Sequence, residues 1–145
     1  MLDERLSLAA QLYEPCALGA DIGTDHALLP CYLLTHNICQ EMILADVSPK
    51  ALLHAEDSVR RHHLEKRAHV RLADGLDALA RYAAESRLVI NATSLGMAGC
   101  AAFGDLSFLR AAPEDAMVYD LVYHPQRTAL LEAASGLGLR AVGGI

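Results

Sequence analysis

Carboxylates and a glycine follow three apolar runs of this sequence, in the positions where a parallel sheet presents ligand-binding residues. Asp21 and Gly23 come at the end of the first run. Asp46 ends the second run, and Asp74 with Gly75 follows the third. Loops after parallel strands meet at one edge of the sheet, and a carboxylate after the second strand can accept hydrogen bonds from ribose hydroxyls. The spacing therefore predicts a nucleotide site at this edge.

The first loop has a single glycine, whereas dinucleotide-binding loops usually carry three, so Gly23 is weak evidence by itself. A purely structural interpretation is also open, in which Gly23 serves a turn and Asp25 caps the next helix. His26 would lie at a helix N-terminus, where the helix dipole disfavours the protonated imidazole.

Strands and helices are predicted to alternate along the whole chain. Apolar runs predict strands at about residues 16–21, 42–46, 69–72, 88–91, 117–122 and 139–142. Helical spacing and capping residues predict helices at about 3–13, 27–34, 49–64, 76–84, 105–110 and 126–135. Pro30 fits the first turn of its helix, and Ser48 with Pro49 fits a helix start. The order predicts one Rossmann-like domain, a three-layer αβα sandwich with a mostly parallel sheet of about six strands.

The loop after the first strand carries a specific motif. Residues 20–33 read Ala-Asp-Ile-Gly-Thr-Asp-His-Ala-Leu-Leu-Pro-Cys-Tyr-Leu, and Asp46-Val-Ser-Pro49 and residues 70–76 follow it. These segments resemble the bacterial tRNA (adenine-N1) methyltransferase family, over about residues 1–79. The resemblance implies an S-adenosylmethionine pocket lined by Asp21, Gly23, Asp25, His26, Asp46 and Asp74. We expect Thr24, Val47 and Gly75 from the same loops, and Asn91 after the fourth strand, to complete the cofactor-binding set.

A second motif begins where that resemblance stops. Residues 90–97 read Ile-Asn-Ala-Thr-Ser-Leu-Gly-Met, and residues 119–128 read Tyr-Asp-Leu-Val-Tyr-His-Pro-Gln-Arg-Thr. Both segments resemble shikimate dehydrogenases, over about residues 87–145. The resemblance implies that the 91–97 loop and the region around Val122 would flank the nicotinamide end of NADP. The glycine-rich phosphate loop and the shikimate-binding domain of that family have no counterpart here.

The two resemblances meet at residues 80–87, which we name the junction. Because each pattern ends where the other begins, the sequence suggests an engineered or reconstructed chimera of two related α/β halves, residues 1–79 and 88–145. Both parental families use the same architecture, so such a chimera would preserve the strand order while replacing the chemistry.

Composition limits the class of partner. The chain has 145 residues, 53% of them hydrophobic, and a formal net charge of -6, which argues against a nucleic-acid binder. No apolar run reaches the roughly 18 residues of a membrane span, so we expect a cytoplasmic protein. Helix caps, strand patterning and turn residues agree on one architecture, which predicts a cooperatively folded monomer. His62, His63 and His69 lack the ligand spacing of a metal site. The cysteines follow no metal or disulfide pattern and are interpreted as small buried residues: Cys16, Cys31, Cys39 and Cys100.

The expected function is binding of S-adenosylmethionine or S-adenosylhomocysteine without efficient turnover. Three alternatives stay open: an active tRNA adenine methyltransferase, an NAD(P)-binding domain like that of shikimate dehydrogenase, and a folded scaffold without a ligand. Among cofactors we expect the adenosyl compounds to bind most tightly, NAD less and NADP least. The reason is that Asp46 would repel the ribose phosphate of NADP, and no arginine lies between Asp46 and Arg60.

Overall fold

The computed structural model describes residues 13–23, 27–72, 84–93, 97–100, 106–122 and 127–143, together with Glu4, Ser7 and Gln11. The predicted helices at 3–13 and 76–84 fall largely outside these residues. Of the predicted cofactor-binding set, Thr24, Asp25, His26, Asp74 and Gly75 lie outside them as well.

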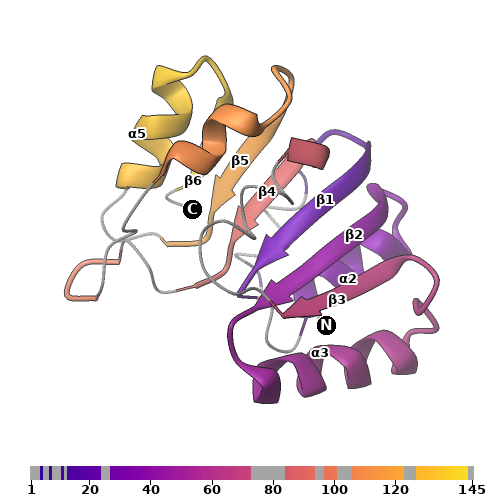
Figure 1. Cartoon of the computed structure of the whole chain (residues 1–145). Helices are drawn as coiled ribbons and strands as arrows, with labels where there is room; N and C mark the ends of the chain where they lie inside the picture. Colours follow the sequence, from indigo (N-terminus) through magenta and orange to yellow (C-terminus); the bar gives the residue numbers. More distant parts are fainter. Residues whose placement is uncertain are drawn as a thin grey trace.

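Six strands of the described chain form one parallel sheet in the order β3-β2-β1-β4-β5-β6 (Figure 1). This is the strand order of the doubly wound nucleotide-binding fold. Successive strands are added outward on one side from β1 to β3 and on the other side from β4 to β6, so the strand order reverses between β1 and β4. The predicted architecture is therefore confirmed. The strands are β1 (Cys16–Ile22), β2 (Cys39–Asp46), β3 (Ala68–Leu72), β4 (Leu88–Asn91), β5 (Met117–Asp120) and β6 (Arg140–Gly143).

Side-chain caps start two of the helices that cover the sheet. Ser48 accepts a hydrogen bond from the Ala51 amide (3.3 Å), and Thr128 accepts one from the Leu131 amide (3.3 Å), each satisfying a free N–H of the first turn. Pro30 lies in the first turn of its helix, as predicted. The helices are α2 (Leu28–Thr35), α3 (Pro49–Arg61) and α5 (Ala129–Gly136), with a 3-10 turn η1 (Ser107–Ala111).

Several boundaries differ from the prediction by two or three residues, namely the ends of α3 and β5 and the starts of β2, η1 and α5. Helix α3 ends at Arg61 rather than near Leu64, because His63 has a positive φ of 57° and the Leu64 amide bonds back to the Val59 carbonyl (3.0 Å). Strand β2 begins at Cys39, before the predicted apolar run, because pairing with β1 already starts there.

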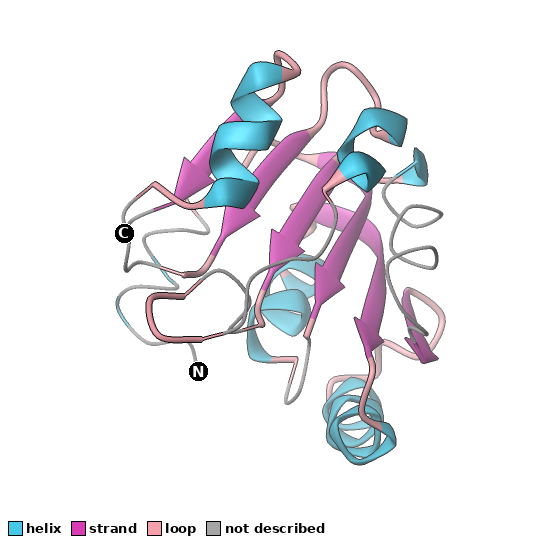
Figure 2. Ribbon diagram, turned by 60° about the vertical axis from the view of Figure 1, so that its left-hand side comes forward, coloured by secondary structure: helices cyan, strands magenta, loops and turns pink. Residues whose placement is uncertain are grey.

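The two faces of the sheet carry separate cores. Figure 2 shows that helices lie on both faces of the sheet. Helices α2 and α3 cover one face, where Leu33 and Ala55 belong to the same buried cluster as Tyr119. On the other face, Phe108 of η1 and Leu130 of α5 belong to a second cluster. Each cluster contains residues from both sides of the junction, so the two halves share their cores.

Strands β1 and β4 join the two halves directly. Gly19 is paired with Leu88 in the parallel register, and the Ala92 amide donates to the Ile22 carbonyl (2.7 Å). A Cβ atom at Gly19 would lie 3.5 Å from the Leu88 Cβ, which is ordinary van der Waals contact. The halves are therefore continuous in hydrogen bonding and in packing at this pair of strands.

The cysteine prediction holds for two residues and fails for a third. Cys31 and Cys39 are buried, and Cys16 is partly buried. Cys100 is exposed, because it lies in a surface turn closed by its amide and the Met97 carbonyl (2.9 Å). Within the described ranges, no helix is long and apolar enough to cross a membrane.

Candidate nucleotide-binding site

A groove of about 450 Å³ lies at the carboxyl ends of β1, β2 and β4. Ligand sites for small molecules typically enclose roughly 300–1,000 Å³, so the groove is large enough for a nucleoside. It also lies where the strand order reverses, which is the usual ligand position in such sheets. The groove is lined by Gly23, Asp46, Val47, Ser48, Lys50, Ala51, His54, Ala92 and Thr93.

Asp46 is fixed at the end of β2 by its own loop. Its Oδ1 accepts a hydrogen bond from the Ser48 amide (2.9 Å), two residues along the chain. Ser48 in turn caps helix α3, so the carboxylate and the helix start are held by one short segment. Among the described residues, the Ser48 amide bonds to Oδ1 of Asp46. The second carboxylate oxygen, Oδ2, can accept a hydrogen bond from a ligand hydroxyl.

Gly23 brings the loops after β1 and β4 into close contact. Its φ is +79°, and its amide donates to the Ala45 carbonyl (2.8 Å). A Cβ atom here would lie 2.5 Å from the Thr93 Cγ2 and 2.9 Å from the Thr93 amide nitrogen. Glycine is therefore required for two independent reasons, the backbone conformation and the space.

Val47 presents an apolar surface beside the carboxylate. Its side chain lines the groove although 71% of the residue is exposed, an unusual position for valine next to two polar groups. A purine ring can cover such a surface, while the neighbouring carboxylate orients the sugar.

The predicted set contains three of the residues that line the groove and lacks the other six, of which two carry ionisable side chains. Lys50 and His54 lie on α3, one turn apart, and both line the groove. The four-residue spacing after the cap, which puts both on one face of the helix, is the signal that could have identified them. Lys50 also supplies a positive charge in the groove. The expected weak binding of NADP was based on the absence of an arginine near Asp46 and did not include this lysine.

Asn91 lies at the same edge of the sheet, but its side chain belongs to a buried network. Its Nδ2 donates to Asp120 Oδ1 (3.0 Å), and its Oδ1 accepts from the Thr93 amide (3.1 Å) and hydroxyl (2.5 Å). Asp120 also accepts from the Val122 amide (3.0 Å) and the Thr128 hydroxyl (2.7 Å). Asn91 therefore positions the Thr93 wall of the groove, and direct contact with a cofactor stays a prediction.

Asp21 is buried in the core rather than in the wall of the groove. Only 1% of the residue is exposed. Burial raises the pKa of the Tyr13 phenol, and the neighbouring Tyr119 and Asp21 raise it further. Burial likewise raises the pKa of the Cys31 thiol to about 11, and Asp21 contributes to the rise. Asp21 pairs in register with Leu44 of β2 and Ile90 of β4, which belong to the cluster that contains Tyr119, so its side chain lies on that face of the sheet.

The fold defines a Rossmann-like α/β domain, and a groove lies at its strand-order reversal. The family comparison is more specific. Residues 2–129 match the methyltransferase domain family, and the chain belongs to that family. The match continues through the junction, beyond the range in which the sequence resembles tRNA methyltransferases.

Curated relatives come from both enzyme classes. A shikimate dehydrogenase (NADP(+)) of Sphingopyxis alaskensis is 57% identical over 60 residues, which are 41% of this chain and 21% of that protein. A tRNA (adenine(22)-N(1))-methyltransferase of Bacillus subtilis is 32% identical over 85 residues, 59% of this chain and 36% of that protein. The chain thus spans between about a fifth and two fifths of the length of these relatives.

Solved structures show the same division. M. capricolum TrmK, in complex with S-adenosylhomocysteine, is 31% identical with a TM-score of 0.58, covering 64% of this chain and 42% of its own. Quinate dehydrogenase from Corynebacterium glutamicum, in complex with NAD, is 23% identical with a TM-score of 0.75, covering 97% of this chain and 48% of its own. The second likeness shows the fold alone. The chain is a Rossmann-like domain related to both S-adenosylmethionine-dependent methyltransferases and shikimate dehydrogenases.

Proposed function

We propose that this chain binds S-adenosylmethionine or S-adenosylhomocysteine in the groove after β1 and β2. The observation that carries the proposal is the Asp46 carboxylate, held by the Ser48 amide (2.9 Å) at the wall of a groove of nucleoside size. Asp46 would accept hydrogen bonds from the ribose hydroxyls, and Val47 would lie against the adenine. The S-adenosylhomocysteine complex of the TrmK relative supports this choice of ligand.

The residues at the wall fit such a ligand. Gly23 carries no side chain where the first loop approaches the ligand, and Lys50 and His54 add polar groups at the α3 side. S-adenosylmethionine supplies an activated methyl group when it is bound. In the proposal the chain's own residues bind and orient the nucleoside, with Thr24, Asp25, His26, Asp74 and Gly75 completing the pocket.

We propose further that turnover is inefficient. Methyl transfer requires that the acceptor be held at the reacting distance, and such positioning contributes about 7–11 kcal/mol to barrier lowering. Asn91 is the polar residue at the end of β4 that could contact an acceptor, but its amide is occupied by Asp120 and Thr93. The end of β4 carries the motif that resembles shikimate dehydrogenases rather than a continuation of the methyltransferase resemblance, and this supports our proposal that the chain is a chimera of two related halves.

NAD is the second candidate ligand. The strand order is the one found in dinucleotide-binding folds, and a shikimate dehydrogenase is 57% identical to this chain over 60 residues. The groove can accommodate an adenosine half in either case, since both ligands share a ribose with two free hydroxyls. The two candidates differ in the pyrophosphate, which would have to approach a loop with one glycine.

Calorimetric titration of the purified chain with four ligands tests the proposal. We expect S-adenosylhomocysteine and S-adenosylmethionine to bind more tightly than NAD or NADP. Methyl transfer to a tRNA transcript and dehydrogenation of shikimate should stay at the level without enzyme. Tighter binding of NAD than of both adenosyl compounds would favour the second candidate, and absence of binding to all four would refute both.

A further inference from the structure

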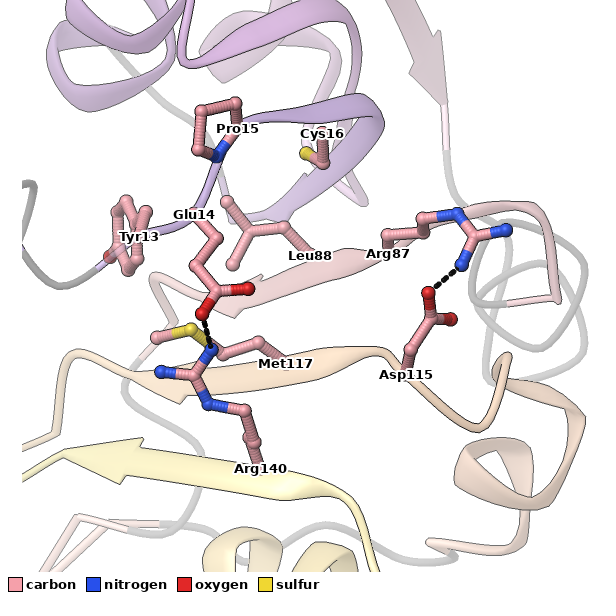
Figure 3. A pocket seen from close by; sticks show the side chains of 9 residues that line it. All are labelled: Tyr13, Glu14, Pro15, Cys16, Arg87, Leu88, Asp115, Met117 and Arg140. Atoms are coloured by element: carbon pink, nitrogen blue, oxygen red, sulfur yellow. Dashed lines mark hydrogen bonds and ion pairs between the residues drawn. The ribbon is translucent and has the colours of Figure 1, made fainter.

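A second cavity lies at the opposite edge of the sheet, where the strands begin. It measures about 110 Å³ and is bordered by the starts of β1, β4, β5 and β6 (Figure 3). Its two arginines are paired, Arg140 with Glu14 (3.0 Å) and Arg87 with Asp115. With its arginines neutralised in this way, the cavity offers little attraction for an anion. Its reactive group is instead the thiol of Cys16.

Cys16 has a second thiol within contact distance. Its Sγ lies 3.3 Å from the Sγ of Cys39, and the two residues are direct partners in the parallel pairing of β1 with β2. Neighbouring strands are roughly 4.8 Å apart, within the roughly 4.4–6.8 Å between Cα atoms that a disulfide needs. Gly19 keeps this space open, because a Cβ atom there would lie 3.2 Å from the Cys39 Sγ.

The two thiols have different surroundings. Cys16 is partly exposed at the cavity, while Cys39 is fully buried. The hydrogen bond between the two thiols lowers the pKa of the Cys16 thiol, against the effect of burial, and Arg87 lowers it further. The same hydrogen bond and burial raise the pKa of Cys39. Cys16 is therefore the better nucleophile and also the more accessible one.

We propose that Cys16 is a peroxide-reactive thiol and that Cys39 resolves it to a disulfide between β1 and β2. The Cys16 thiol loses its proton, and the thiolate attacks one oxygen of a hydroperoxide, so that an S–O bond forms and the O–O bond breaks. The leaving hydroxide or alkoxide takes up the released proton and departs as water or an alcohol. Cys39 then attacks the Cys16 sulfenic acid, the S–S bond forms, the S–O bond breaks, and water leaves with the Cys39 proton. Two thiols are oxidised and one peroxide is reduced.

This pair is separated from the proposed nucleotide groove by the length of the strands. Cys16 and Cys39 begin β1 and β2, whereas Gly23 and Asp46 stand at their ends. The disulfide would link the strand starts without occupying the groove. The proposal therefore does not depend on ligand binding, and its test needs no cofactor.

The test uses the reduced full-length chain, treated with hydrogen peroxide, then with iodoacetamide, and mapped by mass spectrometry. Cleavage before aspartate separates Cys16 from Cys31 and Cys39, which share one peptide. We expect one intramolecular disulfide that contains Cys16 and is reversed by dithiothreitol. It should persist in Cys31→Ala, the matched variant of another buried thiol, and be absent from Cys39→Ala.

Cys39→Ala provides a second measurement, because the first step would then stop at the sulfenic acid. We expect dimedone to label Cys16 in this variant several-fold more than in the unsubstituted chain. The proposal would be overturned if Cys16 and Cys39 were both still alkylated by iodoacetamide after a peroxide treatment that oxidises the exposed Cys100. A disulfide between Cys16 and Cys31, or one formed by Cys100 between two chains as the sole product, would also overturn it.

Discussion

Asn91 and Asp120 tie the ends of β4 and β5 together through a buried hydrogen bond of 3.0 Å from Nδ2 to Oδ1. The carboxylate of Asp120 also accepts a hydrogen bond from the hydroxyl of Thr128, the residue that caps α5. One aspartate therefore connects the Thr93 wall of the groove with the start of the last helix. The network therefore joins two parts of the fold, the segment after β4 at Thr93 and the start of α5 at Thr128.

Replacing Asp120 with alanine should destabilise the protein strongly. The change leaves the buried groups of Asn91 and Thr128 unsatisfied, and we expect a loss of about 3 kcal/mol in the free energy of unfolding. Asp115→Ala is the matched control, because that carboxylate is exposed and pairs with Arg87 at the surface. It should cost less than about 1 kcal/mol. Denaturant unfolding measures both, and equal losses would contradict the role assigned to Asp120.

Gly23→Ala should cost more than the same change at Gly99. Both glycines have a positive φ, +79° and +83°, so both variants incur backbone strain of roughly 1–2 kcal/mol. Gly99 has no neighbour within 4 Å of a built Cβ, whereas Gly23 meets Thr93 at 2.5 Å. Overpacking should therefore add about 1–3 kcal/mol at Gly23 alone.

Thr93→Ser tests the cause of this difference. Serine keeps the hydroxyl that bonds to Asn91 but removes the Cγ2 that a Cβ at Gly23 would meet. Combined with Gly23→Ala, it should recover part of the lost stability in denaturant unfolding. No recovery would mean that the contact with the Thr93 Cγ2 is not what restricts this position.

The sequence was sufficient to place all six strands approximately, because most of them contain a short apolar run. Ser48 with Pro49 was recognised as a helix start from residue type, whereas the start of α5 was predicted three residues too early. The end of helix α3 was predicted less well, because histidine at position 63 does not indicate the positive φ that it adopts.

The candidate site was only partly predictable. Asp46 and Gly23 follow from their places after strands, but Lys50 and His54 line the groove because α3 turns that face toward it. The pairing of Cys16 with Cys39 depends on strand register, which the spacing of the two residues does not reveal. The burial of Asp21 likewise depends on which face of β1 its side chain takes.

Unfolding should be a single cooperative transition, because strands β1 and β4 pair across the junction and both cores contain residues of both halves. Thermal melts followed by near-ultraviolet and far-ultraviolet circular dichroism should coincide. Two separate transitions, or strong binding of the dye ANS at neutral pH, would show that the halves do not form one native structure.

Lys50 should influence NADP more than the other ligands. The ammonium group can pair with the ribose phosphate and offset the repulsion from Asp46, an effect of about 1 kcal/mol for an exposed pair. Lys50→Ala should therefore weaken NADP binding by up to about fivefold and leave S-adenosylhomocysteine binding nearly unchanged. Calorimetric titration compares the two ligands, and an equal loss for both would place Lys50 against a feature they share.

The most direct test of the proposed site is calorimetric titration of Asp46→Ala with S-adenosylhomocysteine. Hydrogen bonds to a charged carboxylate contribute about 1.5–3 kcal/mol each, so losing them should raise the Kd at least about tenfold. Glu41→Ala, an exposed carboxylate on the same strand, should leave the Kd unchanged. An unchanged Kd in Asp46→Ala, with the fold intact by circular dichroism, would contradict the assignment of this groove as the nucleotide site.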